Sequence, residues 1–360
     1  MNIKRIFLIS SVFLLFAIIA SSILIDINKK QIIKNTDPVN FDSVITKISK
    51  DDLKKNLEYL ASDQLEGRMS GKQGNILAAE FVKKQFEEFG LETKYHKFNI
   101  KRTNPGPKNE VGNDFTQNVY GWINGCDKNL KNEIVVIGAH MDHIGYGPSM
   151  SRFGGGKIHP GADDNASGTV ALIELAKCFS KLKNKVKRTV VFMAFSAEEM
   201  GLIGSKFYCD NPLFPIENPD IKNHVFMMNM DMIGYLEKGQ YTVSFSNNNS
   251  SIQVDRIIDE LTEKYKFAPK ITGRRSGGSD HACFYNKKIP IAFLHTGLHN
   301  HYHKPSDTAD KINYEGLTLI VKYAFELSWR IINDESKPIF NCLNFEEMEL
   351  KHDHGALEFK

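Results

Sequence analysis

The chain has 360 residues, 41% of them hydrophobic and 25% charged, which is ordinary for a globular protein that can bury a large core. The formal net charge is only +3, from 46 lysine and arginine residues against 43 aspartate and glutamate residues. The basic residues are spread along the chain rather than gathered in a stripe, so we expect no nucleic-acid partner.

The N-terminal segment has the pattern of an export signal. Lys4 and Arg5 precede an uncharged apolar run over residues 6–25, and a basic start followed by an apolar stretch is typical of a signal peptide. A run of this length can also cross a bilayer. A cleaved signal peptide and a retained membrane anchor at residues 1–25 therefore both stay open. In either case we expect an exported protein that is periplasmic, secreted or membrane-anchored, with its main domain outside the cytoplasm.

Residues 26–50 read as a polar linker, and the pattern after it predicts alternating helices and strands. Apolar residues at helical spacing indicate helices, and short continuous apolar runs indicate buried strands. In chain order we expect helices over 51–61 and 75–89, strands over 94–100, 117–123 and 133–140, a helix over 165–179, strands over 188–195, 224–231 and 241–245, a helix over 251–265, a strand over 289–294 and a helix over 313–332. Apolar strands that alternate with helices indicate an α/β fold with a mostly parallel sheet covered on both faces. We predict one domain over 51–335, followed by a tail over 336–360 of unclear role.

The cysteines leave their pairing open. There are five, at positions 126, 178, 209, 283 and 342, and none forms a C-x-x-C motif. A thiolate metal site is therefore not indicated. A disulfide among them is compatible with export, but the sequence does not choose the pair.

Acidic and histidine side chains follow the predicted strands at the points where the strands end. They are His140 and Asp142, Glu198 and Glu199, Asp231, and the histidines at 295, 299, 301 and 303, together with Asp163 and Asp164 before a predicted helix. In sheets of this kind the ligand site lies beyond the carboxyl ends of the strands. Imidazoles and carboxylates are the ligands that zinc prefers in catalytic sites. The pattern therefore predicts a metal site at this edge.

Each of these motifs also has a structural explanation when it is taken alone. Residues 196–199 fit a helix capping box, and Asp163 and Asp164 fit a turn or a helix cap. His140 and Asp142 fit a surface pair, and residues 295–303 fit a solvated loop. Because all of them fall at the same kind of place, we favour the metal site.

Five ordered motifs resemble those of the co-catalytic di-zinc aminopeptidases, the zinc exopeptidase family that includes glutamate carboxypeptidase II and glutaminyl cyclases. The motifs are "GAHMDHIG", "PGADDNASG", "FSAEEMGLIGS", "MNMDMIGY" and "YHKPSDT", and "LEYLASDQLEGRMSGKQGN" resembles an upstream segment of the family. The resemblance covers roughly residues 50–335. It implies a three-layer α/β/α sandwich with a mostly parallel mixed sheet.

The resemblance also implies a set of metal ligands for two zinc ions per chain. By position these would be His140 and Asp231 on one ion, Glu199 and His303 on the other, and Asp163 as the carboxylate that bridges them. Asp164 would help to hold the loop, with a cis peptide bond joining Asp163 to Asp164. His143 and His281 would line the pocket without an assigned role.

By the same resemblance three further residues have catalytic roles. Asp142 would hydrogen-bond the far nitrogen of His140, Glu198 would act as general base toward a hydroxide activated by the two zinc ions, and Tyr302 would stabilise the oxyanion. The implied activity is removal of N-terminal residues from peptides with a free N-terminus. The alternatives are a glutaminyl-peptide cyclotransferase, a carboxypeptidase of the same family, and a catalytically inactive binding module.

Overall fold

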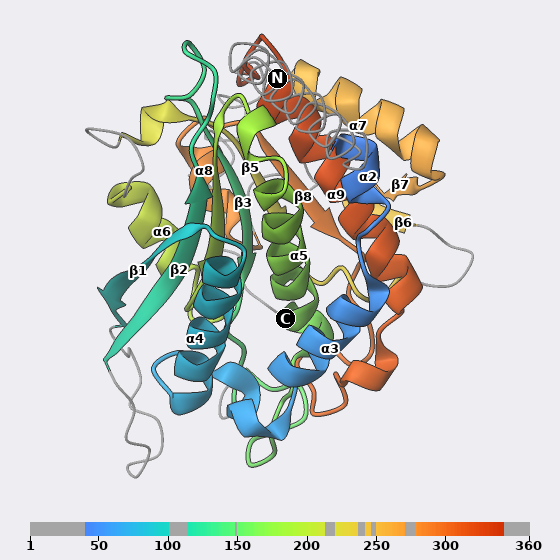
Figure 1. Ribbon diagram of the computed structural model, residues 1–360. Helices are drawn as coiled ribbons and strands as arrows, with labels where there is room; N and C mark the ends of the chain where they lie inside the picture. The colour runs from blue at the N-terminus through green and yellow to red at the C-terminus, as the bar shows by residue number, and fades with distance from the viewer. Residues whose placement is uncertain are drawn as a thin grey trace, which may run out of the picture. The chain divides into compact units, whose positions relative to one another are not determined.

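The computed structural model describes residues 40–100, 114–147, 150–212, 220–236, 242–245, 250–270 and 278–341 (Figure 1). The expected signal or anchor segment, most of the linker and the residues after 341 lie outside these ranges. The chain divides into two units, Met1–Val44 and Ile45–Lys360. The first is described only at residues 40–44, where the short helix α2 (Phe41–Ile45) begins. None of the helices in the described ranges is both long and apolar enough to cross a membrane.

A mixed sheet forms the centre of the second unit. Its strands, within the described residues, are β1 (Glu92–Asn99), β2 (Phe115–Ile123), β3 (Ile134–His140), β4 (Thr189–Phe195), β5 (His224–Met230), β6 (Thr242–Phe245), β7 (Ala268–Lys270) and β8 (Ile291–His295). Their order is β1-β2-β4-β3-β5-β8-β6-β7. Strands β4, β3, β5 and β8 run parallel to one another. On one side of them β2 pairs antiparallel to β4, and β1 pairs antiparallel to β2. On the other side β6 pairs antiparallel to β8. The carboxyl ends of the four central strands therefore meet at one edge.

Helices cover both faces of this sheet (Figure 1). The α-helices of at least six residues among the described ones are α3 (Lys50–Leu60), α4 (Gln73–Glu88), α5 (Gly168–Ser180), α6 (Ile203–Asp210), α7 (Ile252–Tyr265), α8 (His281–Asn286) and α9 (Tyr314–Asn333). Helices α4 and α5 pack on one face, α3 and α9 pack against α5, and α7 packs against α9. Helices α6 and α8 cover the other face. The expected three-layer α/β/α sandwich is confirmed.

The core follows from the two-residue alternation of strand side chains. Tyr120, Met193 and Met227 point to the face of α6 and α8, where they join Tyr208 in one apolar cluster. Phe192, the neighbour of Met193, points to the opposite face and contacts Phe86 of α4 and Phe179 of α5. Both faces of the central strands are buried, which explains their continuous apolar sequence.

Three helices and one strand were not expected from the sequence, and the first of these helices, α2, lies within the predicted linker. Helices α6 and α8 are short, and β7 has three residues, so their apolar periodicity is too brief to read. The predicted helix over 165–179 begins at Gly168, because residues 162–167 form a wide turn first. A side chain at Gly168 would meet the carbonyl oxygen of Met230 at 2.3 Å, so this glycine lets the turn lie against the end of β5.

Candidate metal centre

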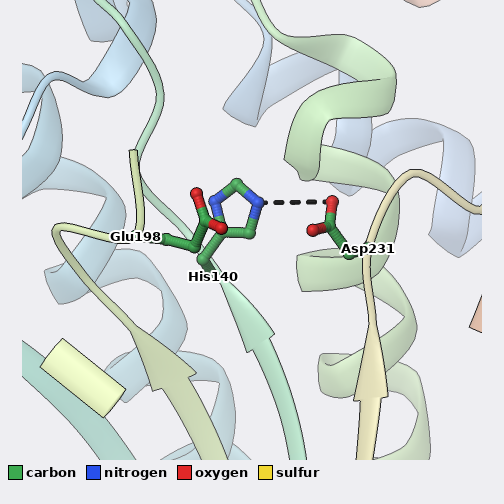
Figure 2. Close-up of side chains that lie close together, drawn as sticks. All are labelled: His140, Glu198 and Asp231. Atoms are coloured by element: carbon green, nitrogen blue, oxygen red, sulfur yellow. Dashed lines mark hydrogen bonds and ion pairs between the residues drawn. The ribbon is translucent and has the colours of Figure 1, made fainter. Parts of the chain in front are cut away.

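The carboxyl ends of β3, β4 and β5 and the residues just after them bring His140, Glu198 and Asp231 together (Figure 2). Each offers one ligand atom, and these atoms all lie within 4.8 Å of one another. A second group of the same kind contains His143, Glu199 and an aspartate from the turn before α5. The expected convergence of separate strand ends is therefore present.

His140 is held with one ring nitrogen toward the acidic residues. Its Nδ1 lies 3.2 Å from the backbone carbonyl of Asp142, which can only accept, so Nδ1 donates. Its Nε2 lies 3.3 Å from an oxygen of Asp231, the contact drawn in Figure 2. Asp231 is fixed in turn, because its amide donates to Leu294 and its carbonyl accepts from His295. The Nε2 atom of His140 is thus oriented so that it can bind a metal ion, while Nδ1 is held by the hydrogen bond to the backbone.

His303 is oriented in the same way in the second group. Its Nδ1 donates to the carbonyl of Met150 over 3.1 Å. Its Nε2 lies 3.1 Å from Glu199 and 3.1 Å from an oxygen of Asp164. His143 joins them, with Nδ1 2.8 Å from the other oxygen of Glu199. The sequence placed His143 only in the pocket lining, whereas the structure puts its ring among the candidate ligands.

Asp164 is the carboxylate that lies between the two groups. Its Oδ1 is 3.4 Å from Nε2 of His140, and its Oδ2 is 3.1 Å from Nε2 of His303. Its amide donates to the carboxylate of Asp307 over 3.1 Å, which fixes the backbone at this point. One side chain therefore reaches both histidines.

The expected bridging residue, Asp163, is turned away, and this corrects the position implied by the resemblance. Its Oδ1 accepts from the amide of Gly234 over 2.6 Å, and its Oδ2 lies 3.0 Å from Nε2 of His299. Neighbouring side chains leave the backbone in different directions, so only one of the pair faces the other ligands. The cis peptide bond also lies one residue further along, between Asp164 and Asn165.

Asp142 contacts His140 through its backbone rather than through its carboxylate. The nearer carboxylate oxygen is 3.8 Å from Nδ1, beyond hydrogen-bonding distance, and it accepts instead from the amide of Glu198 over 3.2 Å. The expected side-chain hydrogen bond is therefore replaced by a carbonyl bond. The carboxylate instead positions the residue that we expect to act as general base.

Glu198 lies in a tight turn and not at a helix start. Ala197 before it has a positive φ of 58°, and α6 begins only at Ile203, so the capping-box alternative does not describe this segment. Burial raises the pKa of Glu198 well above its usual range, and the nearby carboxylates of Glu199 and Asp231 add to this. The surroundings therefore favour the protonated form of this carboxyl group, which suits a residue that carries a proton between two partners.

Tyr302 lies at the side of the second group. Its ring stacks on that of His303, with centroids 3.9 Å apart, and the guanidinium of Arg152 lies 4.7 Å from its centre on the ring face. Burial raises the pKa of Tyr302, and the carboxylates of Asp164 and Glu199 raise it further. Its hydroxyl therefore stays protonated and can donate a hydrogen bond.

The charge pattern fits divalent cations. Burial alone would lower the pKa of His303, but hydrogen bonds to Asp164 and Glu199 raise it to about 10. The acidic groups thus stabilise positive charge strongly at this point. Two sets of imidazole and carboxylate donors that share one carboxylate match the ligand chemistry of zinc.

The sequence profile of peptidase family M28 matches residues 118–328 of the chain. Over 299 residues the chain is 27% identical to a probable leucine aminopeptidase of Trichophyton verrucosum, a match that spans 78% of this chain and 73% of the relative. It is also 27% identical over 234 residues to aminopeptidase YwaD of Bacillus subtilis, spanning 63% of this chain and about half, 47%, of that relative.

Solved structures share the fold. A zinc aminopeptidase from Bacillus subtilis superposes with a TM-score of 0.65 over 81% of this chain and 98% of its own, at 18% identity. A glutaminyl cyclase from Bacteroides thetaiotaomicron superposes with a TM-score of 0.62 over 80% of this chain and 99% of its own, at 16% identity. The fold is therefore common to hydrolases and cyclases, and it does not choose between them.

Proposed function

Because the chain belongs to peptidase family M28, we propose that it is a zinc-dependent aminopeptidase that acts on peptides with a free N-terminus. Relatives that match over most of the chain are named aminopeptidases, which supports this activity. The observation that carries the proposal is the pair of ligand groups joined by Asp164, which suits a site with two cations.

In this proposal His140 and Asp231 would hold one zinc ion and Glu199 and His303 the other, and the Asp164 carboxylate, which lies between the two groups, would serve as a ligand to both. His143 lies close enough to Glu199 to orient it. When bound, zinc polarises the substrate carbonyl and lowers the pKa of water.

The residues of the chain then have distinct tasks. Glu198 accepts a proton from the attacking water and returns it to the leaving amine, and its raised pKa suits both transfers. Tyr302 donates its hydroxyl hydrogen bond to the oxygen that gains negative charge, as donors of this kind do in acyl transfer. Asp142 holds the Glu198 amide and so fixes where the base stands.

We also propose that residues 1–25 direct export, that 26–50 form a linker with the short helix α2 inside it, and that 51–335 are the catalytic domain. The uncharged run over 6–25 supports the first assignment. The disulfide between Cys209 and Cys283 supports an oxidising compartment. Helices α3 and α9 begin and end close to the proposed domain limits.

A panel of aminoacyl-p-nitroanilides, assayed with and without a chelator, tests the activity. We expect hydrolysis that the chelator abolishes and zinc restores. In the Glu198→Gln variant we expect the rate to fall by about 10²–10⁴-fold while zinc remains bound. Glu263→Gln, at an exposed position on α7, is the matched control. No hydrolysis of any member, together with cyclisation of N-terminal glutamine peptides, would overturn the proposal in favour of a cyclase.

A further inference from the structure

Arg68 is a fully buried arginine, 0% exposed, in the segment between α3 and α4. It follows Glu66 and Gly67, and all three residues have positive φ angles, of 48°, 69° and 52°. A side chain at Gly67 would meet the carbonyl oxygens of His159 and Gly145 at 2.5 and 2.7 Å. The backbone at Gly67 therefore packs directly against the backbone at Gly145 and His159, and the Arg68 side chain is buried.

The guanidinium of Arg68 donates to four backbone carbonyls. Nη1 donates to Leu60 and to Pro160, each over 2.6 Å, Nη2 donates to Gly161 over 2.8 Å, and Nε donates to Met141 over 3.0 Å. Leu60 is the last residue of α3, whose terminal carbonyls need partners from outside the helix. One side chain thus joins the end of α3 to two loops that are distant in sequence.

Those two loops carry the candidate ligands. Met141 directly follows His140, and Gly161 lies three residues before Asp164. The loops also touch each other, because a side chain at Gly161 would meet the ring of His143 at 2.5 Å. The backbone of Arg68 adds to this contact, since its carbonyl accepts from the amide of His143 over 3.3 Å.

Arg68 is also a permanent charge beside the acidic residues. Burial lowers the pKa of Arg68 to about 10, against the influence of Asp164, Asp307, Asp142 and Glu199, so it is protonated at neutral pH. Charge-assisted hydrogen bonds are stronger than neutral ones. Lysine would keep the charge but lacks the planar fork that reaches several acceptors at once.

We infer that Arg68 is a positioning residue for the metal centre: its guanidinium holds the loop after β3 and the loop before Asp163 at the separation that zinc binding requires, before any ion is present. The inference rests on the proposed function only in taking zinc as the ion. It assigns a role to a residue that contacts neither metal nor substrate.

Arg188 offers a matched control. It is equally buried, 0% exposed, and it donates to the carboxylate of Glu133 and to the carbonyls of Ile331 and Asp334. Arg188 directly precedes β4, and its partners lie at the start of β3 and the end of α9, at the opposite edge of the sheet from the candidate ligands. A lysine at position 188 disturbs a buried arginine without touching the two loops.

The test compares Arg68→Lys with Arg188→Lys by competitive zinc titration and by thermal unfolding in chelator. We expect both variants to unfold at lower temperature. Only Arg68→Lys should bind zinc more weakly, by about 10–100-fold, the range seen when a residue that orients ligands is lost. Wild-type zinc affinity in a folded Arg68→Lys protein, or equal losses in the two variants, would overturn the inference. Wild-type protein that binds no zinc would instead refute the proposed function.

Hydrogen exchange on the wild-type protein in chelator keeps the inference testable if Arg68→Lys does not fold. The amide of Gly145 donates to Gly67, and the amide of Ala166 donates to Gly161. If the loops are held before zinc binds, both amides stay protected without zinc. Exchange of both at the rate of an open loop, while the amides of β3 remain protected, would overturn the inference.

Discussion

Loss of the bond between Cys209 and Cys283 should lower the free energy of unfolding substantially. The bond joins α6 to α8 on one face of the sheet, with Cα atoms 6.3 Å apart, and the two residues are 74 positions apart. Closing a loop of that length in the unfolded chain corresponds to about 4.4 kcal/mol at 25 °C in the chain-entropy treatment. We therefore expect reduction to destabilise the protein by roughly 4 kcal/mol.

Urea unfolding of the wild-type protein, with and without a phosphine reductant and at fixed free zinc, measures this difference. Fixed zinc is needed because any ligand of the folded state shifts apparent stability. The Cys209→Ala, Cys283→Ala double variant should match the reduced protein and should not respond to reductant. Cys126→Ala, at an exposed cysteine that has no disulfide partner among the residues the structure describes, is the control and should behave as wild type. Equal midpoints for oxidised and reduced wild type would refute the reasoning.

Three further outcomes are expected. Loss of a residue that only orients ligands typically weakens metal binding by roughly 10–100-fold. Asp164→Asn should weaken zinc binding by more than this, whereas Asp163→Asn should stay within that range. The reverse order in a competitive zinc titration would contradict the placement of the two carboxylates. Tyr302→Phe should lower kcat with little change in zinc affinity, because only the hydroxyl donor is lost; unchanged kcat would leave Tyr302 as a packing residue. Burial lowers the pKa of His224 from 6.5 to about 4, so the unfolded chain binds more protons there and stability falls as pH drops from 6.5 to 4. Relative to His224→Gln, the wild type should lose about 3 kcal/mol over that window in urea unfolding; parallel pH profiles would contradict this.

Much of the fold was readable because its central strands are continuous apolar runs. Strands β3, β4 and β5 lie within a residue of their predicted ends, and the expected family and three-layer sandwich are confirmed. The parallel order places their carboxyl ends together, so the strand-end residues were predicted to converge. That step needs only the direction of the strands and not their exact contacts.

Which of Asp163 and Asp164 lies between the two ligand groups could not be predicted from the sequence, because this depends on backbone torsions inside a wide turn. A motif indicates which residues are near, but the local backbone conformation decides which of the two carboxylates faces His140 and His303. The burial of Arg68 could not be predicted from the sequence for a related reason. A single arginine in a glycine-containing loop looks solvated, and its burial arises only when α3 and the two loops come together.

Crystals of the zinc-loaded protein, measured for anomalous scattering at the zinc edge, test the central claim most directly. Two anomalous peaks should appear, one near His140 and Asp231 and the other near Glu199 and His303, with the Asp164 carboxylate between them. A single peak, or two peaks with Asp163 between them, would contradict the account of how this edge of the sheet binds metal.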